Sequence, residues 1–178
     1  MRPIRAHSEA RSHQISQGFT LLELLVVIMV SLILVGIGTP TFTYLIQSNR
    51  AITQSTRWQS TIQYARSEAM KRGKDIYIVS ASNSNNWSDG WYVHADDNGN
   101  GLYDASEELK VFQALPSTSV FSASISMVSF NRKGFVNALR TSDSYQWTLT
   151  QTVCSGDINR EMTLYQSGQL RVSSTTCP

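Results

Sequence analysis

The pattern of hydrophobic and polar positions begins with an almost unbroken apolar run over residues 19–38, in which the only charged residue is Glu23. A helix of this length would be about 30 Å long, which matches the hydrocarbon core of a bilayer. A carboxylate inside such a segment costs on the order of 2.5–3.5 kcal/mol on insertion scales. The pattern therefore predicts a membrane-spanning helix in which Glu23 needs a partner.

Beyond this run the helical pattern continues. Residues 41–72 contain no glycine or proline, and an apolar stripe recurs at sums of three and four residues, through Leu45, Ile52, Ile62, Ala65 and Ala69. We predict an amphipathic continuation of the helix over residues 39–73, with this stripe against a domain and basic residues outside. Gly36, Gly38 and Pro40 stand between the two segments and should weaken or kink the helix there.

After Gly73 the pattern changes to short runs rich in β-branched and aromatic residues, often alternating with polar ones. The short spacers between the runs favour antiparallel hairpins. The predicted strands cover residues 75–81, 90–96, 108–115, 122–131, 134–140, 145–153, 161–166 and 169–174. One long helix followed by many strands predicts an α+β fold.

The charge distribution adds a membrane topology. Residues 1–18 carry three arginines and one glutamate, which is typical of a cytoplasmic flank, so the chain from about Thr39 onward should be exported. No small-residue A-x-A site follows the apolar run, which disfavours an ordinary cleaved secretory signal.

Within residues 19–178 the 12 basic and 12 acidic side chains balance, but they are segregated. Residues 50–74 have a net charge of +5, residues 75–110 of −6 and residues 111–178 of +2. Separate basic and acidic faces favour head-to-tail complementarity between subunits over binding of nucleic acid, for which a strongly basic domain is expected.

The two cysteines, Cys154 and Cys177, both lie in the exported part. An exported pair favours a disulfide, because two thiols are too few for a zinc site. Such a bond should stabilise the domain by roughly 3 kcal/mol in the chain-entropy model.

The start of the apolar run, QGFTLLELLVV, resembles the type IV prepilin signature: a basic leader ends in Gly18, Phe19 follows, and Glu23 is the fifth residue after the glycine. The resemblance implies that prepilin peptidase removes residues 1–18 by cutting between Gly18 and Phe19, and that the new Phe19 amine is methylated. It also implies that Glu23 pairs with the amine of a neighbouring subunit in a filament, and that Pro40 marks a segment that loosens during assembly. The alternative is a signal anchor with an incidental glutamate.

Three further stretches resemble the GspH/FimT family, which contains minor pilins of type IV pili and minor pseudopilins of type II secretion: TIQYARSEAMKRGKDIYIVS (61–80), SDGWYVHADDNGNGLYDASEELKVF (88–112) and VSFNRKGFV (128–136). The resemblance implies a type IV pilin-like fold, in which a long N-terminal helix, transmembrane in its first half, packs on an antiparallel β-rich head of residues 74–178. It also implies a single-pass inner-membrane protein with a periplasmic head, which then joins a filament with other minor and major pilins.

DNA is a further possible partner by resemblance. Some FimT-type minor pilins bind DNA through a Gly-Arg-x-Arg motif near the carboxyl end, and SGQLRVSS (167–174) stands at the matching place. Gly168 and Arg171 match, but Gln169 replaces the first arginine, and the loss of a phosphate contact should weaken binding. Candidate members of a basic patch are Arg132, Lys133, Arg140, Arg160 and Arg171. The alternative is that these side chains keep solvated strand edges from aggregating.

Other chemistry is weakly represented. Residues 96–108 carry several oxygen donors on a glycine-rich turn, but they lack EF-hand spacing, so we predict a plain hairpin loop over a calcium site. We find no catalytic constellation and predict no enzyme activity, no cofactor and no metal site.

The leading hypothesis is a minor type IV pilin in a pilus-tip or initiation complex, with roles in adhesion, twitching motility or DNA uptake. The alternatives are a FimT-type DNA receptor and a type II secretion pseudopilin, of which the terminal disulfide disfavours the pseudopilin.

Overall fold

The computed structural model describes residues 18–99, 103–137 and 143–177, and the predicted leader thus lies outside the described residues except for Gly18. The chain divides into two compact units, Met1–Pro40 and Thr41–Pro178. One helix, α1 (Leu21–Arg72), contributes residues to both units.

Helix α1 begins with a side-chain cap. The hydroxyl of Thr20 accepts the N–H of Glu23 at 3.2 Å, and the Thr20 carbonyl accepts the N–H of Leu24 at the same distance. A threonine three residues before a glutamate is a capping-box spacing, so Glu23 also suits the first turn of a helix. The helix then continues through Gly36, Gly38 and Pro40 without interruption, although proline has no N–H to donate to the ladder.

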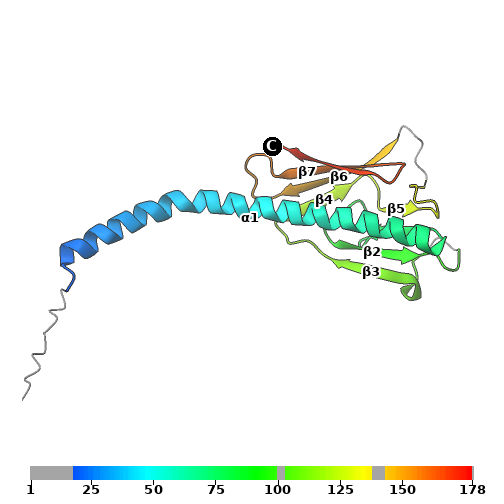
Figure 1. The fold of residues 1–178 in the computed structure, drawn as a ribbon, viewed down its shortest axis with the longest axis horizontal. Helices are drawn as coiled ribbons and strands as arrows, with labels where there is room; N and C mark the ends of the chain where they lie inside the picture. The colour runs from blue at the N-terminus through cyan, green and yellow to red at the C-terminus, as the bar shows by residue number, and fades with distance from the viewer. Residues whose placement is uncertain (1–17, 100–102, 138–142, 178) are drawn as a thin grey trace, which may run out of the picture. The chain divides into compact units, whose positions relative to one another are not determined.

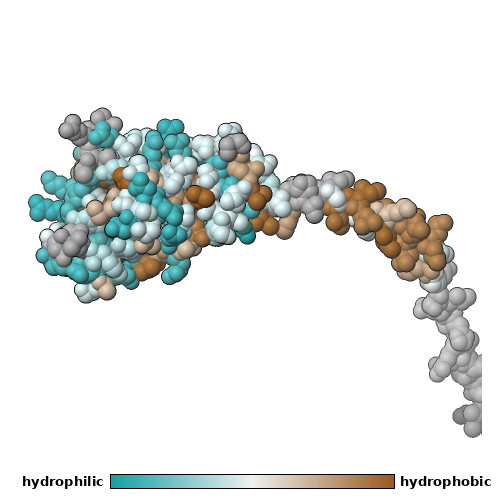
Figure 2. Space-filling view, turned by 180° about the vertical axis from the view of Figure 1, so that it is seen from behind, coloured by the Kyte–Doolittle hydropathy of each residue, from teal (hydrophilic) through white to brown (hydrophobic). Residues whose placement is uncertain are grey.

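The first unit consists, in its described part, of exposed apolar surface. The large apolar side chains between Leu21 and Val35 are all exposed, and Figure 2 shows them as a brown surface on the N-terminal segment. Among the described residues no helix is classed as long and apolar enough to cross a membrane.

The second unit packs the remainder of α1 between two four-stranded sheets (Figure 1). The first sheet has the order β3-β2-β1-β5, and the second has the order β4-β6-β7-β8. All pairings are antiparallel, as the short spacers predict. The strands are β1 (Ile76–Ser80), β2 (Gly90–Ala95), β3 (Glu108–Gln113), β4 (Ser119–Ala123), β5 (Met127–Phe130), β6 (Ser144–Gln151), β7 (Asn159–Tyr165) and β8 (Leu170–Thr175), and a short 3-10 helix, η1 (Ala105–Glu107), precedes β3.

Two strand predictions are wrong. The predicted strand over residues 122–131 is two strands, β4 and β5, which belong to different sheets. The predicted strand over residues 134–140 is not formed in its described part, where only Val136 makes an isolated bridge, to Phe130. Instead Asn131 closes a tight turn, in which its N–H donates to the carbonyl of Phe135 and its carbonyl accepts the N–H of Gly134.

The apolar stripe of α1 also differs from the prediction. Leu45 and Ile52 are about half exposed, at 50% and 48%, so they lie off the packed face. The buried positions of α1 still recur at spacings of three and four, but half of them are polar: Gln47, Ala51, Gln54, Ser55, Trp58, Thr61, Ile62, Ala65, Glu68 and Ala69. A pattern of apolar residues alone therefore selected the wrong positions at the start of the stripe.

Three of the buried polar residues, Gln54 of α1, Ser119 of β4 and Gln151 of β6, form a closed ring of side chains. Gln54 Nε2 donates to Ser119 Oγ at 2.9 Å, Ser119 Oγ donates to Gln151 Oε1 at 2.9 Å, and Gln151 Nε2 donates back to Gln54 Oε1 at 3.1 Å. Because each buried group has a partner, the ring carries little desolvation penalty. It fixes α1 against β4 and β6 in one register.

The carboxyl end is held by the predicted disulfide. Cys154 and Cys177 are bonded, with their Cα atoms 5.6 Å apart, and the Cys177 N–H donates to the carbonyl of Gly156 at 2.9 Å. The bond ties the β6–β7 connection to the residues after β8. The same connection touches α1, since a Cβ on Gly156 would lie 3.4 Å from the ring of Tyr44.

Replacing both cysteines with serine should lower the free energy of unfolding by about 2–4 kcal/mol, because the open chain gains conformational entropy. Urea unfolding of the full chain in detergent, followed by circular dichroism, measures this change. Ser155→Ala is the matched control in the same exposed connection and should change stability by less than about 0.5 kcal/mol. A double variant as stable as the wild type would contradict a stabilising role.

Candidate assembly interface

The predicted processing residues lie together at the start of the described chain. Gly18, Phe19 and Thr20 precede α1 and are exposed, with Phe19 at 82%. The peptide bond between Gly18 and Phe19 is therefore outside regular structure, where a peptidase can reach it. Glu23 lies one turn further on, exposed among apolar neighbours, and within the described residues it has no ion-pair partner.

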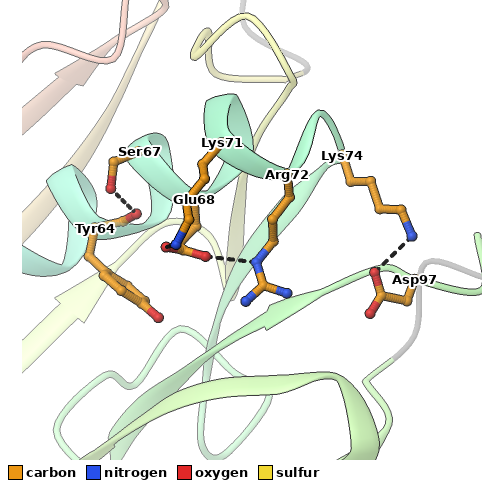
Figure 3. Close-up of polar contacts among 7 residues, drawn as sticks. All are labelled: Tyr64, Ser67, Glu68, Lys71, Arg72, Lys74 and Asp97. Carbon is orange, nitrogen blue, oxygen red and sulfur yellow. Dashed lines mark hydrogen bonds and ion pairs between the residues drawn. The ribbon is translucent and has the colours of Figure 1, made fainter.

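At the other end of α1 the charges are paired internally (Figure 3). Glu68 accepts a hydrogen bond from Arg72 Nε at 2.7 Å and lies 3.4 Å from Lys71 Nζ. The hydrogen bond from Arg72 holds the pKa of the Glu68 carboxyl below its ordinary value, although burial opposes this. Lys74 Nζ contacts Asp97 at 2.9 Å, which likewise lowers the pKa of Asp97 and ties the helix end to the β2–β3 connection.

The β2–β3 connection is organised by its own side chains. Glu107 Oε1 accepts the N–H groups of Asp97 and Asn98 at 2.9 and 3.0 Å, and Asn98 Nδ2 donates to Asp104 at 2.7 Å. β2 and β3 pair as a hairpin, as predicted, although residues 100–102 lie outside the described part. Within the described chain no group of three His, Cys, Asp or Glu side chains is arranged to hold a metal ion.

His94 is buried on the face of the first sheet that points away from α1. It is 1% exposed, its ring stacks on Tyr77 at 5.2 Å, and Tyr103 meets it edge-on at 5.5 Å. Its Nδ1 is buried and has no hydrogen-bond partner within the described residues. Burial is the largest effect and lowers the pKa of His94 below the ordinary histidine value, while nearby carboxylates oppose it more weakly.

This arrangement predicts acid destabilisation in a defined pH window. Because the pKa of His94 is lower in the folded state, the unfolded state binds more protons once the pH falls below about 6.5. The free energy of unfolding should therefore fall between pH 7 and pH 5.5. Glu68 and Asp97, whose pKa values are lowered, lose their contributions only at more acid pH.

Urea unfolding at both pH values measures this loss, and His94→Gln should make the two measurements nearly equal. An unchanged pH dependence in the variant would show that another group is responsible.

The five predicted DNA-binding residues do not all share one surface. Arg140 lies outside the described residues. Arg160 donates through Nη1 to the carbonyls of Asp157 and Asn159 at 2.9 and 3.0 Å. In the register of the second sheet Arg160 stands opposite Ser174 and Arg171 opposite Thr163, so Arg160 and Arg171 lie on opposite faces.

Arg132 and Lys133 are exposed in the turn that Asn131 closes, and this turn meets the β7–β8 turn. The N–H of Val136 donates to the carbonyl of Gln166 at 2.9 Å. A residue that the sequence analysis missed, Arg66 of α1, lies against both turns: a Cβ on Gly134 or Gly168 would come 3.1–3.2 Å from Arg66 Nε. In the sequence, the only sign of this contact was the glycine in each turn, and a glycine does not indicate which residue packs against it.

The comparisons with known proteins agree with this architecture. Residues 14–39 match the prokaryotic N-terminal methylation motif. Residues 54–175, more than half of the chain, match the family model described as type II transport protein GspH. The chain belongs to the GspH family.

Two solved structures share the fold of this GspH-family chain. The type IV minor pilin FimU of Pseudomonas aeruginosa PAO1 is 17% identical, with a TM-score of 0.53 over 68% of this chain and 90% of FimU. The minor pseudopilin EpsH of the Vibrio cholerae type 2 secretion system is 11% identical, with a TM-score of 0.51 over 70% of this chain and 97% of EpsH. No curated sequence gives a significant match.

Membership of the GspH family confirms the resemblance that the sequence indicates, and the shared fold confirms the predicted α+β pilin-like architecture. The methylation motif covers Gly18, Phe19 and Glu23, and it ends one residue before Pro40, the other predicted assembly residue. The identities to FimU and EpsH are too low to carry their roles over to this chain.

Proposed function

We propose that this protein is a minor type IV pilin that joins a pilus-tip or initiation complex. The observation that carries the proposal is the joining of a methylation motif, residues 14–39, to a GspH-family region, residues 54–175, in one chain. The motif supplies processing and packing of the helix, and the β-rich head supplies specific contacts with other subunits.

The proposal gives each segment of the chain a task. Residues 1–18 are a cytoplasmic leader that prepilin peptidase removes, and residues 19–38 hold the mature protein in the inner membrane. Residues 39–73 extend the helix into a periplasmic head of residues 74–178. The exposed apolar surface of α1 between Leu21 and Val35 supports this division, because such a surface needs lipid or neighbouring helices to cover it.

In the filament, the methylated amine of Phe19 on one subunit meets Glu23 of another. A carboxylate is costly in an apolar bundle when it is alone, but it is tolerated when it is paired and hydrogen-bonded. The absence of a described ion-pair partner for Glu23 within its own chain supports an intermolecular partner.

Processing provides the direct test. Mature protein extracted from membranes should begin at a methylated Phe19, as intact mass and amino-terminal sequencing would show. Gly18→Leu should block cleavage, since a side chain at this position obstructs the close approach that glycine allows. Gln17→Leu, one residue earlier, is the matched control and should be processed. Retention of the leader by the wild type, or cleavage after Gly38, would refute the proposal.

The type II secretion pseudopilin is the second candidate function, favoured by the fold shared with EpsH. Deletion of the gene separates the two in a host that has both systems. Loss of surface pili and twitching with intact protein secretion supports the pilin, and the reverse result supports the pseudopilin.

A further inference from the structure

Basic side chains of the head fall into two groups. Most have a partner within the described residues: Arg50, Arg57, Lys71, Arg72, Lys74 and Arg160 make hydrogen bonds or ion pairs, and Lys110 lies over the rings of Tyr64 and Phe112. Four have no hydrogen bond or ion pair from their side chains to any described residue: Arg66, Arg132, Lys133 and Arg171. We call these four residues the basic corner.

The basic corner is built around Arg66. The glycines of two turns, Gly134 and Gly168, are buried, and both have positive φ, at +78° and +77°. A Cβ on Gly168 would lie 2.9 Å from the carbonyl oxygen of Gly134 and 3.1 Å from Arg66 Cδ, so only glycine lets the turns close on the arginine. The Arg66 Nε is buried there without a hydrogen-bond partner within the described residues.

The other three members lie in or next to the two turns. Arg132 and Lys133 directly precede Gly134 in its turn and are exposed. Arg171 is exposed on β8, three residues after Gly168, which corresponds to about 10 Å of extended chain. Three elements that are distant in sequence thus bring four unneutralised positive charges to one end of the second sheet.

A cluster of acidic residues lies on the other side of α1. The β2–β3 connection carries Asp96, Asp97 and Asp104, and Glu108 begins β3. Figure 1 shows β2 and β3 on one side of α1 with β6 and β7 on the other. The head therefore presents opposite charges on its two flanks. A contact between the basic flank of one subunit and an acidic flank of the next is heterologous, and heterologous contacts that do not close generate helical filaments.

We propose that the basic corner is the surface through which this chain docks an acidic surface of the adjoining pilin-fold subunit. The inference rests on the proposed function and adds the surface and the charge of the partner. Charge complementarity of this kind mainly sets the orientation of the partner and its rate of association. A compact acidic loop fits the corner better than an extended nucleic-acid backbone, since Glu161 shares the outer face of the second sheet with Arg171.

Zero-length cross-linking of sheared filaments tests the docking, because a carbodiimide joins only amines and carboxylates in direct contact. We expect Lys133 to be linked to an aspartate or glutamate of another pilin-fold subunit, whether a copy of this chain or a different one, as identified by mass spectrometry. Lys133→Gln should abolish this link. Arg171→Gln should reduce its yield by about fivefold, and so should 0.5 M salt, because both weaken the attraction.

Lys71→Gln is the matched control. Lys71 is exposed but is already paired with Glu68, so its removal should leave the Lys133 link unchanged. Filaments that contain the chain but give no Lys133 link to a subunit would overturn the inference and leave the proposed function intact. Tight binding of duplex DNA by the full chain at physiological salt, lost in Lys133→Gln, would overturn it in favour of a nucleic-acid site. Absence of the chain from all filaments would overturn both proposals.

Discussion

A Glu23→Val variant should reach the membrane in at least wild-type amounts but be recovered from sheared filaments at about a hundredfold lower level. Insertion improves because a charge leaves the apolar run. Incorporation fails because the amine of the neighbouring subunit is left without its carboxylate in a dry environment. Removing one member of a buried ion pair costs about 3–5 kcal/mol, and every 1.4 kcal/mol is a factor of ten.

Two measurements are needed, one on membranes and one on sheared filaments, each by quantitative immunoblotting. Ser31→Val is the matched control in the same run. The hydroxyl of Ser31 donates to the carbonyl of Val27 at 2.7 Å, so it needs no partner on another subunit, and this variant should assemble normally. Wild-type recovery of Glu23→Val from filaments would contradict the pairing of Glu23 with a subunit amine.

The elements that the sequence predicts well are those whose pattern is local. The long helix follows from a run of 32 residues, 41–72, without glycine or proline, and its end coincides with Gly73. The hairpins of β1 with β2, β2 with β3, and β7 with β8 follow from strand-like runs that are consecutive in the sequence and separated by polar, glycine-containing or serine-rich connections. In these elements local propensity and tertiary packing agree, so the local signal is sufficient.

The division of residues 122–131 between two sheets could not be predicted in this way. The alternation of polar and apolar residues continues through Ser124 and Ser126, with no glycine or proline to break it. The break comes from partners elsewhere: Ala123 pairs with Trp147 of β6, whereas Met127 pairs with Val79 of β1. A strand that changes sheets is defined by its neighbours, which the local pattern does not contain.

The candidate site divides in the same way. Gly18, Phe19 and Glu23 are close in sequence and form one motif, so the sequence identified them together. Arg66 was missed because it is separated from Gly134 and Gly168 by many residues and meets them only when α1 packs beside two turns. Its place near the packed stripe made it look like an ordinary solvent-facing arginine.

The central aromatic cluster was also beyond the sequence, which shows four tryptophans without showing that they meet. Trp58 of α1 is fully buried, and its ring lies 4.9–5.4 Å from the rings of four other aromatic side chains, Trp87, Trp91, Phe121 and Trp147. Three of these partners belong to β2, β4 and β6, so one side chain joins the helix to both sheets.

Trp58→Ala should therefore lower the free energy of unfolding by about 3–5 kcal/mol, which is the range for truncating a buried aromatic side chain. If the total stability of the head is near the lower end of the usual range of about 5–15 kcal/mol, this loss leaves the head largely unfolded at 37 °C. Trp58→Phe should cost much less, because the Trp58 Nε1 has no hydrogen-bond partner within the described residues and its removal relieves a buried unsatisfied donor. Phe135→Ala, at an aromatic side chain that is 45% exposed, is the control and should change stability by about 0.5 kcal/mol or less.

Urea unfolding of the full chain in detergent, followed by circular dichroism, ranks the three variants. If Trp58→Ala is no less stable than Phe135→Ala, the cluster does not hold α1 to the two sheets.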